Sequence, residues 1–160
     1  MRHSYQKVRF WHTGSDMAYP EPLILPMRED LTRHGVVEAR TAADVDRVIL
    51  ENPTVLMVIN SVCGCAAGKA RPAVGLALKH AQVKPDVTAT VFAGADVEAT
   101  AHLRQAHLPA VPPSSPSMAL FRDGKLVWVM HRFEIESRVA PQIAEELVKA
   151  FEQHCARQVA

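Results

Sequence analysis

Residues 54–71 read TVLMVINSVCGCAAGKAR. The apolar run at residues 54–59 predicts a buried strand, and the small residues after Cys65 are compatible with a helix. The segment Cys63-Gly64-Cys65 therefore lies where a strand ends and a helix begins. Backbone N–H groups and the positive end of the helix dipole lower the pKa of a thiol at such a junction. The sequence thus predicts a reactive pair of cysteines.

One residue separates the two thiols, so a disulfide between them would close a very small ring that is hard to reconcile with relaxed disulfide geometry. A strained disulfide is easily reduced and is more oxidising than a structural one. Glycine suits the intervening position because its backbone is unrestricted. We expect thiol–disulfide exchange, with Cys63 at the helix tip as the nucleophile and Cys65 as the resolving cysteine.

The bulk properties indicate a globular domain. The chain has 160 residues, of which 48% are hydrophobic and 22% charged, as is usual for one folded domain. A formal net charge of +1 argues against a nucleic acid or a membrane as the main partner. Three cysteines do not suit a secreted disulfide framework, and no secretory signal is recognised, so a reducing cytoplasm is expected.

The first residues do not follow this pattern. Residues 1–16 are polar and aromatic, and Met17 is a plausible second start. We interpret residues 1–16 as a disordered extension, a remnant of cloning or a misassigned start. Residues 17–160 are expected to form a single domain.

Hydrophobic periodicity and turn residues predict the other elements. The helix after the cysteines is expected to run to about residue 81 with a kink at Pro72. The Asp123-Gly124 pair predicts a hairpin turn. The remaining predictions are a helix at 22–34, an edge strand at 36–39, a helix with a capping box from Thr41, a strand at 87–92, a helix capped by Asp96 and running to about 106, strands at 118–121 and 126–130, and a helix opened by Pro141.

After one leading helix, this order is β-α-β-α-β-α-β-β-α. Parallel crossovers in the first half and an antiparallel hairpin at the end give an α/β mixed sheet with helices on both faces. The order resembles that of the thioredoxin fold with an extra N-terminal helix. The cysteines fall at the start of the second core helix, where that fold keeps its redox site.

Residues 60–72, NSVCGCAAGKARP, resemble the signature of the bacilliredoxins, a family of small bacterial thioredoxin-fold proteins. The resemblance continues at 91–94 (VFAG), 113–120 (PSSPSMAL) and 154–155 (HC). It implies removal of bacillithiol, a low-molecular-weight thiol, from mixed disulfides on client proteins. It also implies no tightly bound cofactor, bacillithiol as co-substrate, and S-thiolated proteins as partners of a monomer or weak homodimer.

The resemblance also implies a substrate-binding surface. The thioredoxin fold places a cis-proline opposite its active cysteines, so we expect a cis Ser115–Pro116 bond. Ser115 would then offer backbone groups to substrate beside Pro116 and Gly64. Lys69 and Arg71 are expected to be solvated helix residues that could attract an acidic thiol.

Asn60 and Ser61 are expected only to satisfy loop backbone. Ordinary thioredoxins carry a buried acid six residues before the first cysteine and a tryptophan directly before it, where this chain has Met57 and Val62. Both differences weaken the assignment as a general reductant.

Two alternatives stay open. The first is a disulfide isomerase or weak oxidase acting on protein substrates. The second is a metal-binding or partner-binding module, in which Cys63, Cys65, Cys155 and a histidine could supply ligands. Only one closely spaced cysteine pair is present, which is unlike most zinc sites, so we predict no metal ligands. Cys155 is expected to be a peripheral thiol at a helix end.

Overall fold

The computed structural model describes residues 18–157. The interpretation of residues 1–16 therefore lies outside the described residues. Within the described part of the chain, no helix combines the length and the apolar character needed to cross a bilayer.

One five-stranded mixed sheet organises the fold, with the strand order β1-β3-β2-β4-β5. The first three of these strands run parallel, and the last two join them antiparallel. Every residue of the central strand β2 is buried. The strands span β1 Val37–Glu38, β2 Thr54–Asn60, β3 Val87–Phe92, β4 Ser117–Arg122 and β5 Lys125–Met130.

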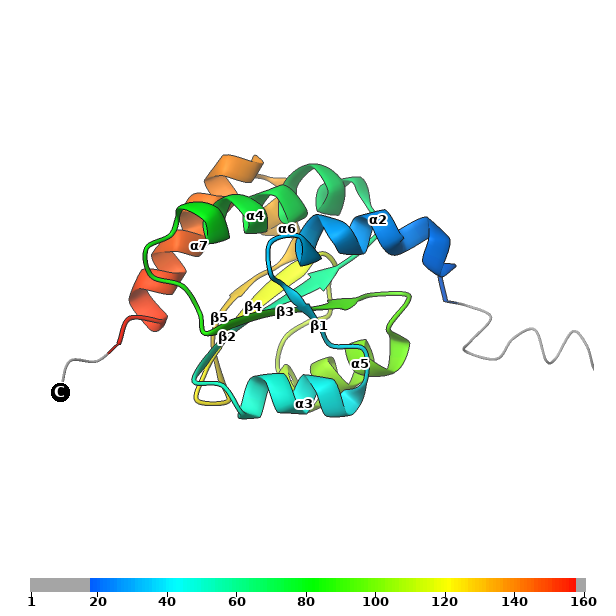
Figure 1. The fold of residues 1–160 in the computed structure, drawn as a ribbon, viewed down its shortest axis with the longest axis horizontal. Helices are drawn as coiled ribbons and strands as arrows, with labels where there is room; N and C mark the ends of the chain where they lie inside the picture. Colours follow the sequence, from blue (N-terminus) through cyan, green and yellow to red (C-terminus); the bar gives the residue numbers. More distant parts are fainter. Residues whose placement is uncertain (1–17, 158–160) are drawn as a thin grey trace, which may run out of the picture.

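Helices cover both faces of the sheet (Figure 1). One layer holds α2, α4, α6 and α7, and the other holds α3 and α5. The helices span α2 Glu21–Thr32, α3 Ala42–Leu50, α4 Arg71–His80, α5 Val97–His102, α6 Arg132–Glu136 and α7 Ala140–His154. The π-helical segments η2 Ala66–Ala70 and η3 Leu103–His107 precede α4 and follow α5.

The alternation of side chains along β2 builds two hydrophobic cores. Leu56 and Val58 point into the core beneath α2, α4 and α7. Val55, Met57 and Ile59 point into the core beneath α3 and α5. Because successive residues of a strand face opposite sides of a sheet, this uninterrupted apolar run requires a helical layer on each face. The predicted α/β mixed sheet with an N-terminal helix is therefore confirmed.

Capping and turn residues end several elements where the sequence predicts. Thr41 and Asp44 form the predicted capping box at the start of α3. Asp123 and Gly124 adopt φ angles of 51° and 77°, as a type I′ hairpin turn requires at both central positions.

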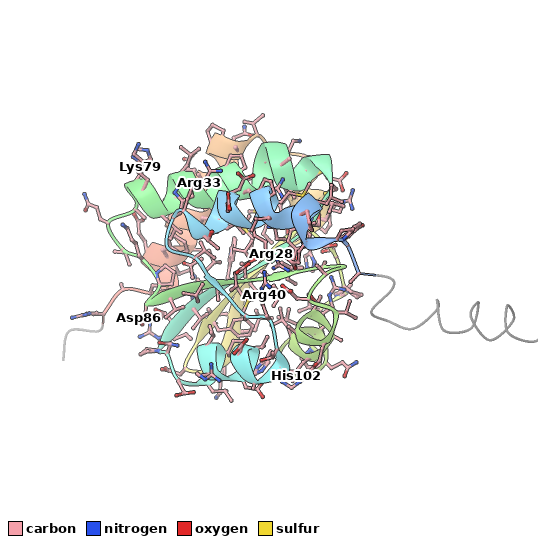
Figure 2. The ribbon with its side chains drawn as sticks, turned by 45° about the vertical axis from the view of Figure 1, so that its right-hand side comes forward. Arg28, Arg33, Arg40, Lys79, Asp86 and His102 are labelled. Carbon is pink, nitrogen blue, oxygen red and sulfur yellow. The ribbon has the colours of Figure 1, made fainter. Side chains whose placement is uncertain are left out.

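The predicted helix start at Asp96 is confirmed, although its side chain is engaged elsewhere. Asp96 occupies the N-cap position, but it makes no side-chain capping bond. Its carboxylate instead accepts hydrogen bonds from both terminal nitrogens of Arg28, at 2.9 and 2.8 Å, and from the backbone N–H of Phe92. Arg28 is 2% exposed and projects from α2 toward the sheet (Figure 2). A buried arginine thus competes successfully for this carboxylate.

The helix that follows the cysteines also differs from its prediction. Instead of one α-helix with a kink at Pro72, the π-helical turn η2 leads into α4, and Pro72 lies in the first turn of α4. The Arg71 N–H bonds to the Ala66 carbonyl, five residues back. A proline at the start of a helix segment loses no hydrogen bond that the segment needs.

Candidate active site

The two cysteines of interest lie directly after the central strand. β2 ends at Asn60, and the first helical residue is Gly64. The Cys63 carbonyl accepts the backbone N–H groups of Ala66 and Ala67 at 3.0 and 3.2 Å. Cys63 therefore stands at the N-terminal end of the helical stretch, where free N–H groups and the helix dipole favour a negative charge. All three cysteines are in the thiol form.

Several groups act on the Cys63 thiol. Burial alone would raise its pKa, but the Ser61 hydroxyl, the N–H groups of Ala66 and Cys65, and the positive charge of Arg132 outweigh burial. The Ser61 Oγ lies 3.1 Å from the Cys63 Sγ. The net effect lowers the pKa of Cys63, because hydrogen bonds to the charged form favour that form. The expectation of a lowered Cys63 pKa is thus confirmed.

The prediction that Ser61 only satisfies loop backbone is therefore wrong. Ser61 is buried, and its hydroxyl lies within hydrogen-bond distance of both the thiol and the backbone N–H of Cys63. Only its position two residues before a reactive cysteine could have drawn attention to it. Serine is so common in loops that this signal is weak.

The segment before β4 contains the predicted cis bond between Ser115 and Pro116. Arg132 connects this segment to the helix α6. Its guanidinium donates to the Ser115 carbonyl at 3.2 Å, and its backbone N–H donates to the Ser114 hydroxyl at 3.3 Å. Because the Arg132 charge also acts on Cys63, this side chain links the cis-proline segment with the thiol.

Sequence reasoning missed Arg132 because it missed α6. That helix has only five residues, Arg132–Glu136, so hydrophobic periodicity cannot reveal it. The signal present in the sequence is Glu134, which accepts the backbone N–H of His131 at 2.8 Å and caps the turn.

Arg71 is not the solvated residue that the sequence suggested. It is 3% exposed, and its guanidinium donates to the Asn60 side-chain oxygen and to the Ser61 carbonyl at 3.3 and 3.2 Å. The Asn60 oxygen also accepts the Ser61 N–H, and its amide nitrogen donates to the Met27 carbonyl in α2. Arg71 and Asn60 thus brace the backbone that carries Ser61, so Asn60 too does more than satisfy its own loop.

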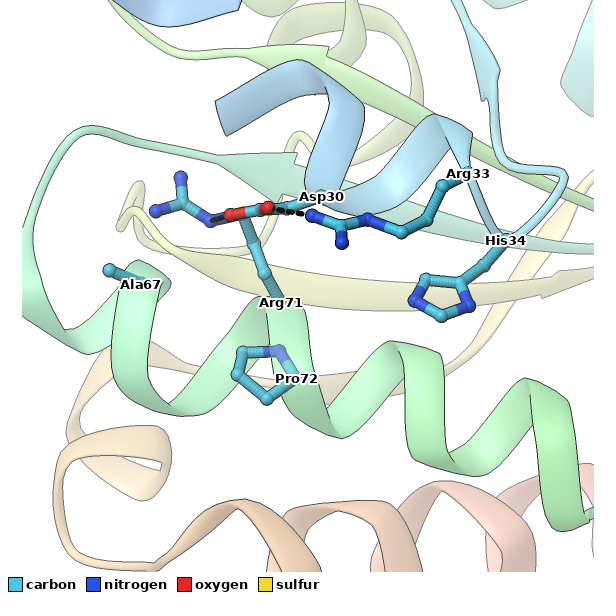
Figure 3. A pocket seen from close by; sticks show the side chains of 6 residues that line it. All are labelled: Asp30, Arg33, His34, Ala67, Arg71 and Pro72. Atoms are coloured by element: carbon cyan, nitrogen blue, oxygen red, sulfur yellow. Dashed lines mark hydrogen bonds and ion pairs between the residues drawn. The ribbon is translucent and has the colours of Figure 1, made fainter. Parts of the chain in front are cut away.

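Asp30 of α2 lies beside Arg71 at the edge of an open pocket of ≈ 290 Å³ (Figure 3). Its carboxylate oxygen is 3.3 Å from the Arg71 Nε, and the same carboxylate pairs with Arg33. The pocket also contacts His34, Ala67 and Pro72. Both guanidinium groups at this pocket are therefore neutralised in part by one carboxylate.

Two predicted site residues remain, Gly64 between the cysteines and the half-buried Lys69 in η2. Gly64 is exposed, and a side chain added there would contact nothing within 4 Å. Its φ angle is outside the left-handed region, so the reduced form does not need glycine for its backbone conformation. The Lys69 Nζ donates to the Glu136 carbonyl at 2.5 Å, which ties η2 to the end of α6.

Cys155 does not contribute to this site. It follows the last turn of α7, is 9% exposed, and packs in the core beneath α4 and α7. Burial raises the pKa of its thiol. Among residues 18–157, the group of side chains arranged to hold a metal contains no cysteine. The structure therefore does not bring Cys155 to the Cys63–Cys65 pair as a shared metal site would require.

Comparison with known proteins identifies relatives of this chain. A family profile described as disulphide isomerase matches residues 19–155. The chain is 50% identical over 141 residues to a bacilliredoxin of Salinibacter ruber, covering 87% of this chain and 81% of that one. It is 46% identical over 139 residues to a bacilliredoxin of Bacillus cereus, covering 86% and 95%.

Solved structures support the fold alone. A putative oxidoreductase with a thioredoxin fold aligns with a TM-score of 0.56 at 16% identity, covering 74% of this chain and 98% of that chain. A thioredoxin variant from Halobacterium salinarum aligns with a TM-score of 0.55 at 18% identity, covering 81% and 96%. Together with the sequence relatives, these findings show that the chain belongs to the bacilliredoxin family and is a thioredoxin-fold redox protein of the thiol–disulfide oxidoreductase type.

Proposed function

We propose that this protein removes bacillithiol from mixed disulfides on client proteins, with Cys63 as nucleophile and Cys65 as resolving cysteine. One observation carries the proposal: the Cys63 pKa is lowered at a helix tip, with a second thiol two residues further on. A lowered pKa supplies the thiolate, which is the nucleophile in thiol–disulfide exchange. The family membership supplies the class of substrate.

The reaction needs two exchanges. The Cys63 thiolate attacks the bacillithiol sulfur of the client mixed disulfide, and the client cysteine leaves as a thiolate. Cys65 then loses its proton and attacks the Cys63 sulfur, which releases bacillithiol as a thiolate and forms the Cys63–Cys65 disulfide. A second low-molecular-weight thiol can replace Cys65 in this step. A further reductant of the thiol class returns the enzyme to its dithiol form.

The surroundings of the thiols suit an anionic substrate. The Arg132 side chain is 43% exposed; its Nε pairs with Glu136 at 2.7 Å, and its terminal nitrogen donates to the Ser115 carbonyl. We assign the exposed Gly64, the half-buried Ser115 and the buried Pro116 to substrate binding. Lys69 remains an accessory candidate, whereas the burial of Arg71 favours a bracing role. The proposed partners are S-thiolated proteins and the small thiol, and the proposed location is a reducing cytoplasm. The protein would act as a monomer or weak homodimer and would hold no tightly bound cofactor.

Mass spectrometry of a trapped intermediate tests the proposal. Cys65→Ser, incubated with a bacillithiolated protein, should accumulate one bacillithiol adduct on Cys63 because the internal resolving step is blocked. Cys63→Ser should form no adduct and should not release the client. Adduct formation on Cys65 in the Cys63→Ser variant would reverse the two roles. Absence of an adduct on Cys65→Ser, together with no release of bacillithiol from the client by the wild type, would refute the proposed substrate.

Disulfide isomerisation is the second candidate function, because the matching family profile carries that description. The same nucleophile would attack a protein disulfide rather than a mixed disulfide. Recovery of activity from a scrambled disulfide protein, compared with the rate of de-thiolation under the same conditions, separates the two. Isomerase activity in Cys65→Ser would show that the resolving cysteine is dispensable for it.

A further inference from the structure

The face of the sheet opposite α4 carries a cluster that the redox site does not use. The His102 Nε2 and the His107 Nε2 each lie 2.7 Å from the same Asp46 carboxylate oxygen. Asp46 belongs to α3, whereas the histidines belong to α5 and η3. His102 is drawn in the α3–α5 layer in Figure 2. These three donor atoms lie within 4.8 Å of one another.

The π-helical segment η3 creates this convergence. His102 and His107 are five residues apart, and on a regular α-helix of 3.6 residues per turn such residues point in clearly different directions. The wider turn of η3 brings them onto one face, so that their rings meet edge to face at 5.8 Å between centroids. Such π-helical turns occur often at functional sites, and the other one in residues 18–157 adjoins the cysteines.

We propose that Asp46, His102 and His107 form a binding site for a divalent transition metal, Zn²⁺ in the first instance. Imidazole nitrogens and a carboxylate oxygen are ordinary zinc ligands, and this donor set suits Zn²⁺ better than Ca²⁺ or Mg²⁺. Three protein ligands leave a fourth position for water. This proposal goes beyond the redox function and does not depend on it.

The side chains of Asp46 and His102 are partly exposed, so an ion can reach the cluster from solvent. The exposed fractions of the side chains are 43% for Asp46 and 30% for His102, whereas His107 is held at 9% against the Phe121 ring. Ligand atoms of a tetrahedral zinc ion lie about 3.3 Å apart, given Zn–ligand bonds of about 2.0–2.1 Å. The two 2.7 Å contacts to Asp46 are shorter than this, so the partly exposed Asp46 carboxylate must move outward to admit the ion. Each imidazole then carries its proton on Nδ1 and offers its Nε2 lone pair.

Zinc binding must be measured without interference from the thiols, which also bind Zn²⁺. We therefore suggest the full chain with Cys63 and Cys65 replaced by serine and with the buried Cys155 replaced by alanine. Titration with Zn²⁺ alone should show one bound equivalent, and Co²⁺ should give visible bands without thiolate charge transfer. Protons should compete with Zn²⁺ for the site, because a protonated histidine cannot ligate a metal.

Replacement of the ligands tests whether Zn²⁺ binds at Asp46, His102 and His107. Asp46→Asn and His107→Gln should each lose the bound equivalent, whereas His80→Gln, at an exposed position in α4, should retain it. Asp46 is at the surface, so Asp46→Asn keeps the proposal testable if His107→Gln fails to fold. Absence of Zn²⁺ binding by the thiol-free protein, or binding that survives Asp46→Asn, would overturn the proposal and leave a hydrogen-bonded His–Asp–His cluster only.

Discussion

At the scale of single residues, Cys63 and Cys65 have different surroundings although one residue separates them. Cys63 faces the Ser61 hydroxyl and two helix N–H groups, and these lower its pKa. Cys65 is half-buried and packs against the core beneath α4 and α7. The lowered pKa favours a thiolate at Cys63, which is the physical basis for proposing this residue as the nucleophile.

Replacing Ser61 by alanine should raise the pKa of Cys63, because the hydroxyl donor at 3.1 Å is lost. The pH profile of Cys63 alkylation should move to higher pH. At neutral pH the rate should fall by about tenfold, since a hydrogen bond to a charged group contributes about 1.5 kcal/mol. Ser137→Ala in the loop after α6 is the matched control. An unchanged profile in Ser61→Ala would show that the helix N–H groups suffice.

Gly64 and Gly124 should respond oppositely to alanine. Gly64→Ala should leave the thermal stability of the reduced protein unchanged or slightly raised, since nothing within 4 Å obstructs a side chain there. Gly124→Ala should lower the free energy of unfolding by about 1–2 kcal/mol. Gly124 has a φ of +77°, and an added Cβ would approach Leu50 to 3.3 Å. Urea unfolding with a thiol reductant measures both.

If Gly64→Ala proves as destabilising as Gly124→Ala, the folded protein constrains Gly64 more than its exposed position indicates. If Gly64→Ala is stable but slow in exchange, glycine serves the oxidised form or substrate approach.

At the scale of elements, long periodic segments could be predicted and short ones could not. The bounds of β2 and β3 agree with the sequence because each is a continuous buried run. Helix α6 could not be predicted because its five residues are too few to show hydrophobic periodicity. The π-helical turn η2 could not be foreseen, since its five small or flexible residues, Ala66–Ala70, are equally compatible with an α-helix.

The candidate site shows the same contrast. The cysteines and the cis-proline segment could be located because sequence order and family resemblance place them. Arg132 and Arg71 could not be distinguished from ordinary surface arginines, because burial and long-range contacts decide their roles.

Helix α6 contributes to the site mainly through Arg132. Loss of the Arg132 charge should therefore change the rate of exchange more than the free energy of unfolding. Arg132→Gln should slow exchange with an anionic disulfide by up to about fivefold, because an exposed charge contributes no more than about 1 kcal/mol. The dependence of the rate on salt concentration should also weaken. Arg138→Gln, which removes a neighbouring positive charge outside α6, is the control. Equal effects of the two variants would mean that only net charge matters.

At the scale of the whole molecule, the sheet lies between the cysteine pair and the proposed metal site. The thiols lie at the end of β2 on the side of α4, and the Asp46–His102–His107 cluster lies in the α3–α5 layer on the opposite face. Arg104 in η3 donates to the Ser114 carbonyl at 3.2 Å, so the element that carries His107 also contacts the cis-proline segment. The two sites are thus on separate faces yet share one structural neighbour.

The pH dependence of global stability should reveal the buried thiol of Cys155. Burial raises the pKa of this thiol, with Asp86 acting in the same direction and Thr54 and Arg122 opposing it. In the unfolded chain the thiol titrates near about 8.5. Above that pH the unfolded chain binds fewer protons than the native state, so the free energy of unfolding falls as pH rises toward the native pKa. Below it, the contribution of Cys155 is fully present.

Cys155→Ala should abolish this decline. Urea unfolding under reducing conditions at about pH 7.5 and about pH 9.5, on either side of the free thiol pKa, should show a smaller loss of stability in Cys155→Ala than in the wild type. Cys63, whose lowered pKa acts in the opposite direction, is present in both proteins and cancels in the comparison. De-thiolation should be unchanged, since Cys155 lies in the core rather than beside Cys63. Parallel pH profiles would mean that Cys155 is solvated in the native state, and a loss of de-thiolation would bring it into the reaction.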